Sequence, residues 1–400
     1  MRKHKLWMRD IAFDQNNIFF SAMQFNGLFK ASIYGGEAIY MGSFPNESDS
    51  KVGLHGDVVQ YKDEILFLPN LADYLALYNI KQDSFASIKF PVQEDTEVTS
   101  YLPKIASGIL VGSCAYAFGC RYPCIVRYDF ETGCLKYYDE SECFKKFDPK
   151  ENKSFFGIDL CLIENSIFAR TCQADAIVEF DVVEEKLFFH PLKKKMSIIL
   201  CGDQEKLWLF EENGMGIYTW NKWNGLSEVM QFQGYSRKNK QELVCSVQLK
   251  DEIWIFSLLS EFVLKWNKVN KKLEEESFFC IENSQIYQND SFASILFRKK
   301  HNDKIYLMSV LENKLYCFSE NGDENYCVDI YTDRTEIVRK LFTEQTFLNE
   351  QEDTLWSIAY GLEDFLNVVT VENKSEEYDN RQIKAGTKIY KHLKSLFKEN

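Results

Sequence analysis

Apolar and polar residues alternate in short blocks along most of the chain, and the blocks recur at a regular interval. The stretch from Asp251 to Leu273 shows one unit: a polar pair, an apolar run at 253–256, a polar turn, and a second run that ends in Trp266-Asn267. The first apolar residue of the corresponding run stands at Ile18, Ile65, Ile109, Ile167, Leu207, Ile253, Ile305 and Leu355, at intervals of 40 to 58 residues. Four short strands with their turns need a repeat of about this length.

A second position fixes the register of the repeat. An aromatic residue followed by Asn or Asp, here called the closing pair, ends the next strand at Tyr78-Asn79, Tyr128-Asp129, Phe180-Asp181, Trp220-Asn221 and Trp266-Asn267, with Phe318-Ser319 as a weaker copy. Turn residues follow the closing pair, and a further apolar residue stands seven positions after the aromatic at Phe85, Leu135, Leu187 and Leu273. Another apolar run precedes each unit, so each unit is predicted to contain four antiparallel strands.

These patterns predict an all-β fold, a single β-propeller at residues 1–345. We expect about seven four-stranded antiparallel blades, with eight or six as alternatives. The second strand of a unit is almost wholly apolar, as in Leu207-Trp208-Leu209-Phe210, which is typical of a strand covered on both faces. Trp208, Trp254 and Tyr306 are therefore expected to lie between adjacent blades.

The repeat fades after residue 345, although Leu355 opens an incomplete eighth copy. Residues 346–400 are predicted to form a C-terminal extension with a short helical tail. An amphipathic helix is expected at 387–398, because its apolar residues recur at helical spacing and Thr387 can cap its start.

One segment of the repeat resembles a known family. Tyr128-Asp129-Phe130-Glu131-Thr132-Gly133-Cys134-Leu135 is similar to the Tyr-Asp-x-x-Thr-x-x-Trp segment of kelch repeats. Over roughly residues 8–345 the order of strands and turns resembles kelch-type and streptogramin-lyase-like β-propellers. Kelch units carry a Gly-Gly pair after the second strand, and no copy here has that pair, so the resemblance implies a divergent propeller. It implies the fold, and no catalytic residue is carried over from it.

Composition narrows the class of partner. The net charge is −13, from 47 basic and 60 acidic residues, which argues against nucleic acid because its phosphates are bound by Lys and Arg. Short basic runs such as Lys193-Lys194-Lys195 are expected to be solvated loops. No stretch of 18 to 20 apolar residues predicts a helix across a membrane.

Cysteine and histidine usage predicts neither a metal nor a cofactor. The twelve cysteines form no Cys-x-x-Cys pair, and the five histidines are far apart in the sequence. Unpaired cysteines in this number suit a reducing compartment, and the N-terminal residues have no secretion-signal pattern. A cytoplasmic protein is therefore expected.

Polar residues recur in the turn between the second and third strands. They stand five residues before the closing aromatic or at the matching place in the first unit: Asn26, Asp73, Asp175, Glu261 and Asn313. Equivalent turns of a propeller open on the same face, so these side chains are expected to surround one mouth of the channel as a ligand-binding site, with His55, Tyr101, Arg121 and Arg170 near them. Asn and Asp also stabilise tight turns by themselves, so a purely structural role stays open. Several carboxylates at one mouth would favour a cation, an amine or a basic partner.

The usual catalytic motifs are missing. The sequence has no Gly-x-Ser-x-Gly, His-Glu-x-x-His or phosphate-loop motif. We therefore expect a non-catalytic binding or scaffold propeller that uses one face of the ring for a protein partner or for a small-molecule or sugar ligand. The alternative is a propeller enzyme, a lyase or a carbohydrate-active protein, with its site at the channel mouth. His55 within hydrogen-bond reach of a ring carboxylate would favour the enzyme.

Overall fold

The computed structural model describes residues 3–49, 51–91, 103–147, 153–203, 206–211, 216–231, 243–249, 251–257, 263–276, 298–309, 314–319 and 325–333. The chain divides into two units, of which Lys5–Tyr331 is the propeller. The second unit comprises Met1–His4 and Thr332–Asn400. The helix expected at 387–398 lies outside the described residues.

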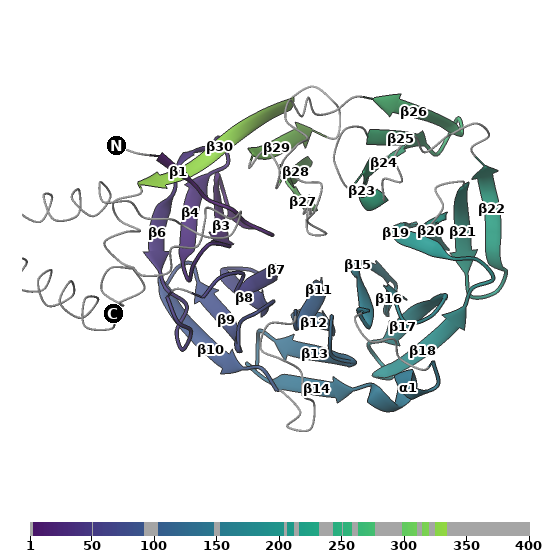
Figure 1. Ribbon diagram of the computed structural model, residues 1–400, viewed down its shortest axis with the longest axis horizontal. Helices are drawn as coiled ribbons and strands as arrows, with labels where there is room; N and C mark the ends of the chain where they lie inside the picture. The colour runs from purple at the N-terminus through teal and green to yellow at the C-terminus, as the bar shows by residue number, and fades with distance from the viewer. Residues whose placement is uncertain are drawn as a thin grey trace, which may run out of the picture. The chain divides into compact units, whose positions relative to one another are not determined.

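The propeller has seven four-stranded antiparallel blades in a ring, which confirms the predicted fold (Figure 1). Blade 1 contains β2 (Ala12–Asp14), β3 (Asn17–Ser21), β4 (Leu28–Ser32) and β6 (Ile39–Gly42), and blade 2 contains β7 (His55–Tyr61), β8 (Glu64–Pro69), β9 (Tyr74–Asn79) and β10 (Ser84–Lys89). Blade 3 contains β11 (Ile105–Val111), β12 (Cys114–Gly119), β13 (Cys124–Asp129) and β14 (Leu135–Asp139), and blade 4 contains β15 (Phe156–Ile163), β16 (Ser166–Thr171), β17 (Ala176–Asp181) and β18 (Lys186–Pro191). Blade 5 contains β19 (Met196–Asp203), β20 (Lys206–Glu211), β21 (Gly216–Asn221) and β22 (Gly225–Gln231), and blade 6 contains β23 (Leu243–Gln248), β24 (Glu252–Ser257), β25 (Val263–Asn267) and β26 (Lys272–Glu276). Blade 7 contains β27 (Arg298–His301), β28 (Lys304–Ser309), β29 (Lys314–Ser319) and β30 (Asn325–Asp333). Two short elements stand outside this pattern: β1 (Lys3–Lys5) precedes blade 1 in the chain, and the helix α1 (Ser141–Lys145) follows blade 3.

Each blade is one continuous stretch of chain, apart from the short β5 (Gly36–Glu37) between β4 and β6. The first strand of each blade faces the centre of the ring and the last lies at its rim (Figure 1). β5 leaves blade 1 and pairs in parallel with β30 of blade 7. The Leu6 N–H also donates to the Ile330 carbonyl at 3.3 Å, so backbone hydrogen bonds join the last blade to the first.

A buried ionic network adds to this closure on the channel side. Lys299 on β27 donates from Nζ to Asp10 Oδ2 at 2.7 Å and to the Val58 carbonyl at 2.6 Å. Asp57 on β7 accepts from Ser107 Oγ at 2.9 Å and from the Gly108 N–H at 2.7 Å. The network therefore connects the inner parts of blades 7, 1, 2 and 3.

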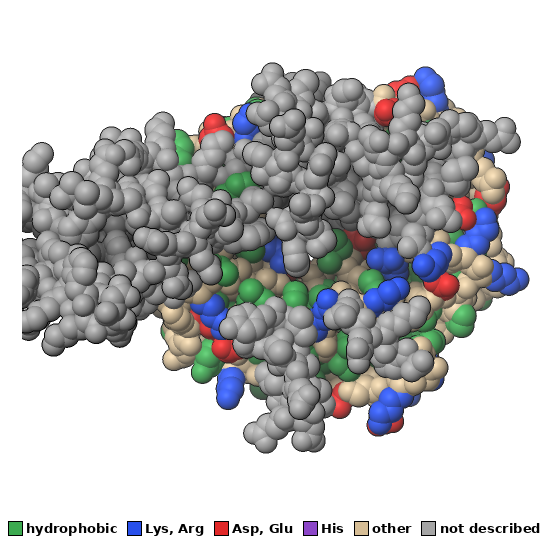
Figure 2. Space-filling model, viewed as in Figure 1, with side chains coloured by type: hydrophobic (Ala, Val, Ile, Leu, Met, Phe, Trp, Pro, Cys, Tyr) green, Lys and Arg blue, Asp and Glu red, His purple; other side chains and the backbone are tan. Residues whose placement is uncertain are grey.

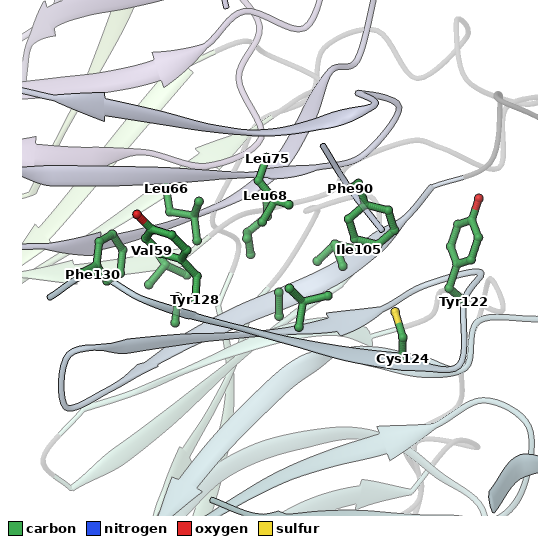
Figure 3. Packing of buried hydrophobic residues seen from close by; sticks show 13 residues of the cluster. Val59, Leu66, Leu68, Leu75, Phe90, Ile105, Tyr122, Cys124, Tyr128 and Phe130 are labelled. Carbon is green, nitrogen blue, oxygen red and sulfur yellow. The ribbon is translucent and has the colours of Figure 1, made fainter. Parts of the chain in front are cut away.

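Apolar side chains of the second and third strands fill the space between neighbouring blades. Figure 3 shows the cluster between blades 2 and 3, where Val59, Leu66 and Leu68 pack with Cys124 and Tyr128. The residues expected between blades occupy the same kind of place further along the ring. Trp208 is buried with residues of blade 6, the partly buried Trp254 packs against residues of blade 7, and Tyr306 is buried against Phe13 of blade 1.

The closing pair has a simple structural cause. Its aromatic residue is buried between blades, and the Asn or Asp begins the hairpin turn that leads to the outermost strand. The Asn221 side-chain oxygen accepts from the N–H groups of Trp223 at 3.1 Å and Asn224 at 2.7 Å. Side-chain oxygens of Asn79, Asp129, Asp181 and Asn267 accept in the same way from the backbone N–H groups that follow them. An Asn or Asp at this place therefore fixes the turn by itself.

Two further positions of this turn repeat around the ring. The residue four places after the Asn or Asp has a positive φ in five blades: Asp83, Gly133, Glu185, Gly225 and Lys271. The residue two places after it is an exposed apolar side chain in blades 4, 5 and 6: Val183 at 71%, Trp223 at 71% and Val269 at 75% exposure. The fold therefore uses the first position for its backbone conformation and leaves the second side chain in solvent.

Trp266 and Trp223 form a matched pair for testing the core. Trp266 is fully buried between blades 5 and 6, so Trp266→Ala should lower the free energy of unfolding by about 3–5 kcal/mol through lost burial and an unfilled cavity. Trp223→Ala removes the same side chain from an exposed turn and should change it by less than about 0.5 kcal/mol. Denaturant unfolding of both variants checks this, and equal losses would contradict the assignment of the core.

Gly225 isolates the backbone requirement of the turn. Its φ is +67, and a Cβ added there would meet no atom within 4 Å, so Gly225→Ala changes only the conformational preference of the backbone. We expect a loss of about 1 kcal/mol in unfolding free energy. Gly225→Asn should lose less, because Asn tolerates the left-handed conformation better. Thermal and denaturant unfolding would show the order Gly, Asn, Ala; an Ala variant as stable as the parent would refute it.

Candidate functional site

The turns between second and third strands and the links between blades lie at the same end of the strands, and we call this side of the ring the loop face. Asn26, Asp73 and Asp175 stand in such turns of blades 1, 2 and 4, and Arg121 stands in that of blade 3. His55 begins β7, and Arg170 is near the end of β16. Tyr101, Glu261 and Asn313 lie outside the described residues.

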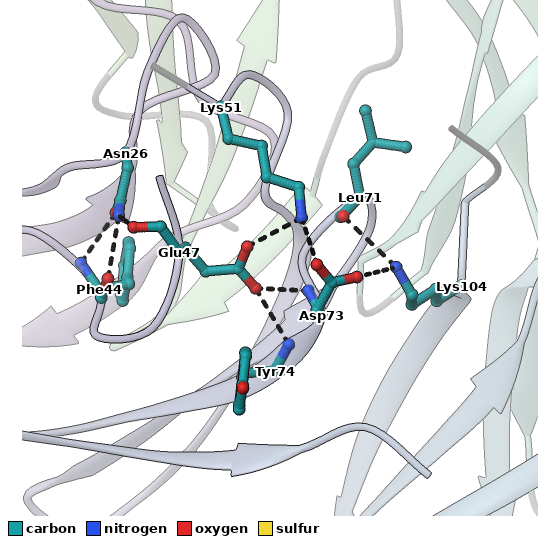
Figure 4. A network of polar contacts seen from close by, with 8 residues as sticks. All are labelled: Asn26, Phe44, Glu47, Lys51, Leu71, Asp73, Tyr74 and Lys104. Carbon is teal, nitrogen blue, oxygen red and sulfur yellow. Dashed lines mark hydrogen bonds and ion pairs between the residues drawn. The ribbon is translucent and has the colours of Figure 1, made fainter. Parts of the chain in front are cut away.

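Asn26 is fully buried and holds the link between blades 1 and 2 (Figure 4). Its Nδ2 donates to the carbonyls of Phe44 at 2.9 Å and Glu47 at 3.1 Å, and its Oδ1 accepts from the Phe44 N–H at 2.8 Å. Both polar atoms of the amide are therefore used inside the protein. Asn26 positions the loop that carries Glu47 and Lys51.

Asp73 lies between two lysines (Figure 4). Lys51 Nζ is 2.8 Å from Asp73 Oδ2, and Lys104 Nζ is 3.1 Å from Asp73 Oδ1. Partial burial would raise the pKa of Asp73, but the hydrogen bonds from Lys51 and Lys104 outweigh it and lower that pKa. Glu47 also pairs with Lys51, at 2.9 Å. These two carboxylates are balanced by two ammonium groups, so together they add no net negative charge to this part of the loop face.

His55 is buried among aromatic rings. Its Nδ1 is 3.1 Å from Ser21 Oγ, and its ring lies 4.4 Å from that of Phe44 and 5.7 Å from that of Phe67. Burial, with a smaller effect from the Lys51 charge, lowers the pKa of His55 to about 3. The imidazole is therefore neutral at physiological pH. Its hydrogen-bond partner is a hydroxyl rather than one of the carboxylates expected at the channel mouth. The contact that would have favoured an enzyme is not present at His55.

The loop face is hollowed between blades 4 and 5. A cavity of about 370 Å³ lies there, with a wall that is largely polar. Its wall is formed by Lys153, Ser154, Arg170, Thr171, Cys172, Gln173, Ala174, Asp175, Ala176, Leu192, Lys195 and Met196. It contains two residues of the predicted site, Arg170 and Asp175. Lys153 and Lys195 were not predicted, because each stands in a link whose sequence indicates only a solvated loop.

Hydrogen bonds hold the wall in shape. The Gln173 side chain donates from Nε2 to the Lys153 carbonyl at 2.9 Å, and the Thr171 hydroxyl donates to the Phe155 carbonyl at 2.7 Å. Arg170 Nη1 donates across to the Met196 carbonyl at 3.2 Å. These contacts join the turn of blade 4 to the link before it and to the start of blade 5, so the cavity is built from backbone and side chains that are already fixed.

Positive charge is in excess at this cavity. Among the described residues of its wall, Lys153, Arg170 and Lys195 stand against one carboxylate, that of Asp175. Figure 2 shows basic side chains gathered near the middle of the ring, in the region of β15, β16 and β19. On the side of Ser154, the Cys120 thiol lies 3.2 Å from the Ser154 hydroxyl, and the adjacent Arg121 has a buried Nε without a hydrogen-bond partner in the described structure.

A second cavity, of about 550 Å³, lies among the inner strands of blades 3 to 7. Apolar side chains such as Ile109, Leu160 and Ile305 form much of its wall, and Lys299 and Lys300 also reach it. The Lys299 ammonium already pairs with Asp10.

In the described part of the chain, no three His, Cys, Asp or Glu side chains are placed to hold a metal ion together, and no helix there is long and apolar enough to cross a membrane.

Comparison with known proteins identifies the fold. No family model and no curated protein matches the chain. Among solved structures, a catalytically inactive variant of virginiamycin B lyase from Staphylococcus aureus with quinupristin is 13% identical, with 76% of this chain and 94% of that chain covered and a TM-score of 0.53. A streptogramin B lyase structure is 14% identical, with 80% and 94% covered and a TM-score of 0.52. The computationally designed Ika8 protein is 9% identical, with 81% and 87% covered and a TM-score of 0.50. At these identities the likeness is one of fold: the chain is a β-propeller, similar in fold to streptogramin B lyases.

Proposed function

We propose that this protein is a non-catalytic binding module that takes a small polar molecule or sugar in the cavity between blades 4 and 5. The observation that supports the proposal is the cavity itself, about 370 Å³ in volume, which is within the usual range for small-ligand sites. Polar groups from the turn of blade 4 and from the links on either side of that blade converge on it. A protein partner would instead need a contact of about 800 Å² on each side.

The contacts of His55 do not favour the enzyme alternative. The lyases share the fold, but one propeller fold serves unrelated functions. An acid–base mechanism needs a titratable group close to the reacting atoms, whereas His55 is buried, neutral and bonded to Ser21. We therefore propose binding without catalysis.

The location that we propose is the cytoplasm. Cys134 and Cys327 are exposed free thiols. Exposed free thiols persist in a reducing compartment and tend to oxidise outside it. This supports the expectation from the sequence.

Filling the cavity tests the binding site. Ala174 lines the cavity, so Ala174→Trp should occupy the ligand's space and reduce retention of small molecules from a cell extract by tenfold or more, by analogy with the loss of a key contact. Ala86→Trp makes the same change at an exposed position of the outermost strand β10 and should retain them as the parent does. Mass spectrometry of molecules released from each purified protein is the measurement. Equal recovery from both variants would overturn the proposed site.

Asp73 should affect stability rather than binding in the cavity. The Lys104 side chain is only 4% exposed, whereas that of Asp73 is 51% exposed, so Asp73→Ala should cost about 1–2 kcal/mol, less than for a fully buried pair. Lys104→Met in the same chain should recover most of this loss.

The pH dependence follows from the direction of the shift. Because the pKa of Asp73 is lowered in the folded protein, its ion pairs stabilise the fold above the unfolded-state pKa of about 4 and are lost as the pH falls through the folded-state value. The difference between the parent and Asp73→Ala should therefore shrink in acid. Denaturant unfolding at pH 7 and at about pH 3 measures it; a gap that widens in acid would contradict the ion-pair assignment.

A further inference from the structure

We propose that the cavity between blades 4 and 5 binds an anionic group, the carboxylate or phosphate of a small ligand, and that Arg170 is the main contact to it. This inference rests on the proposed function and adds the ligand's chemical class. It differs from the expectation that carboxylates on the loop face would attract a cation.

Arg170 has donors left for a ligand. Its Nη1 donates to the Met196 carbonyl at 3.2 Å, and its Nη2 lies 3.6 Å from the Cys172 sulfur, a weak acceptor. A guanidinium has five N–H groups in a planar fork, so these two contacts fix its orientation and leave the others available. Among the described residues no carboxylate pairs with Arg170. A planar fork held in place matches the two oxygens of a carboxylate or phosphate.

The neighbouring charges favour an anion at the same point. Lys153 and Lys195 line the cavity with Arg170, and Asp175 is the only acidic residue among the described residues of the wall. The protein as a whole has a net charge of −13, so this excess of positive charge is local and opposes the general field. Charges in a partly enclosed site interact more strongly than charges in open water. A cation would meet three basic side chains there.

Three other lysines of the described ring are already paired. Lys51 and Lys104 are occupied by Glu47 and Asp73, and Lys299 is occupied by Asp10. Among the described residues of the wall between blades 4 and 5, basic side chains outnumber acidic ones around a defined volume.

The side chain of Asp175 restricts the class of ligand further. Its backbone carbonyl accepts from the Leu192 N–H at 2.8 Å, which holds the residue at the rim, and its side chain is exposed. The carboxylate would repel a second anionic group but accept a hydrogen bond from a hydroxyl or amino group. The ligand class is therefore a small molecule with one anionic group and a hydroxyl or amino group beside it, such as a hydroxy acid, an amino acid or a sugar monophosphate.

Two substitutions that should change the affinity for anions in opposite directions test the charge argument. Calorimetric titration of the full chain at low ionic strength would use inorganic phosphate, acetate and methylammonium as separate probes. We expect the two anions to bind and methylammonium not to bind, and the preferred anion shows whether the natural group is a phosphate or a carboxylate. Arg170→Gln should weaken anion binding about tenfold, as for loss of one partner of a charged hydrogen bond. Asp175→Asn should strengthen it about threefold by removing a repulsion.

Two further variants are controls. Lys81→Gln removes one positive charge from a side chain 75% exposed on a hairpin turn of blade 2, and should leave binding unchanged. Arg170→Lys keeps the charge without the fork and should lie between the parent and Arg170→Gln. The melting temperature of each variant shows whether it folds. If the Arg170 variants do not fold, the effect of Asp175→Asn on anion binding alone decides the test.

The outcomes separate this inference from the proposed function. Binding of methylammonium in place of the anions, an Arg170→Gln variant that binds anions like the parent, or weaker anion binding by Asp175→Asn would each overturn the inference. If anions fail to bind but Ala174→Trp still abolishes retention of a cellular ligand, the binding site stands and only its anionic class is wrong. If Ala174→Trp has no effect either, the proposed function fails as well.

Discussion

Lys299 joins the last blade of the ring to the first two by hydrogen bonds to Asp10 and to the Val58 carbonyl, and the loop face depends on this closure. Only in a closed ring do the turns of all blades reach the same height along one axis. A buried ammonium is costly unless its donors are satisfied, so the network specifies one register between blade 7 and blades 1 and 2. The stack of Phe13 on His301, 4.2 Å between ring centres, adds apolar contact at the same junction.

The candidate site arises from this arrangement rather than from a motif. Around blade 4, the turn between β16 and β17 stands beside the link that precedes β15 and the link that leads to β19. Polar residues from three separate segments therefore meet in one hollow. Arg170 is held by a carbonyl of the next blade, which means that the packing of two blades determines where its remaining donors point. The fold supplies the position, and the identity of a few side chains supplies the chemistry.

Much of the fold could be predicted because its causes are local and repeated. The aromatic of the closing pair is buried between blades, and its Asn or Asp fixes the following turn, so both leave a periodic mark in the sequence. The same periodicity placed Arg170 and Asp175 near one face. The charge of that face could not be predicted, because Lys104 and Lys195 stand in irregular links and their neighbours are distant in sequence. His55 shows the same limit: nothing local distinguishes a buried histidine against Phe44 and Phe67 from a ligand-binding one.

The exposed turn residues Val183, Trp223 and Val269 have a consequence for how such a protein can change. Their turns are held by hydrogen bonds from backbone N–H groups to the side-chain oxygens of Asp181, Asn221 and Asn267, so the exposed side chains contribute little to folding. They stand on the face opposite the loop face, at equivalent places in three successive blades. New side chains could be introduced there without disturbing the cavity between blades 4 and 5. The ring thus provides two surfaces that can evolve, or be engineered, independently of each other.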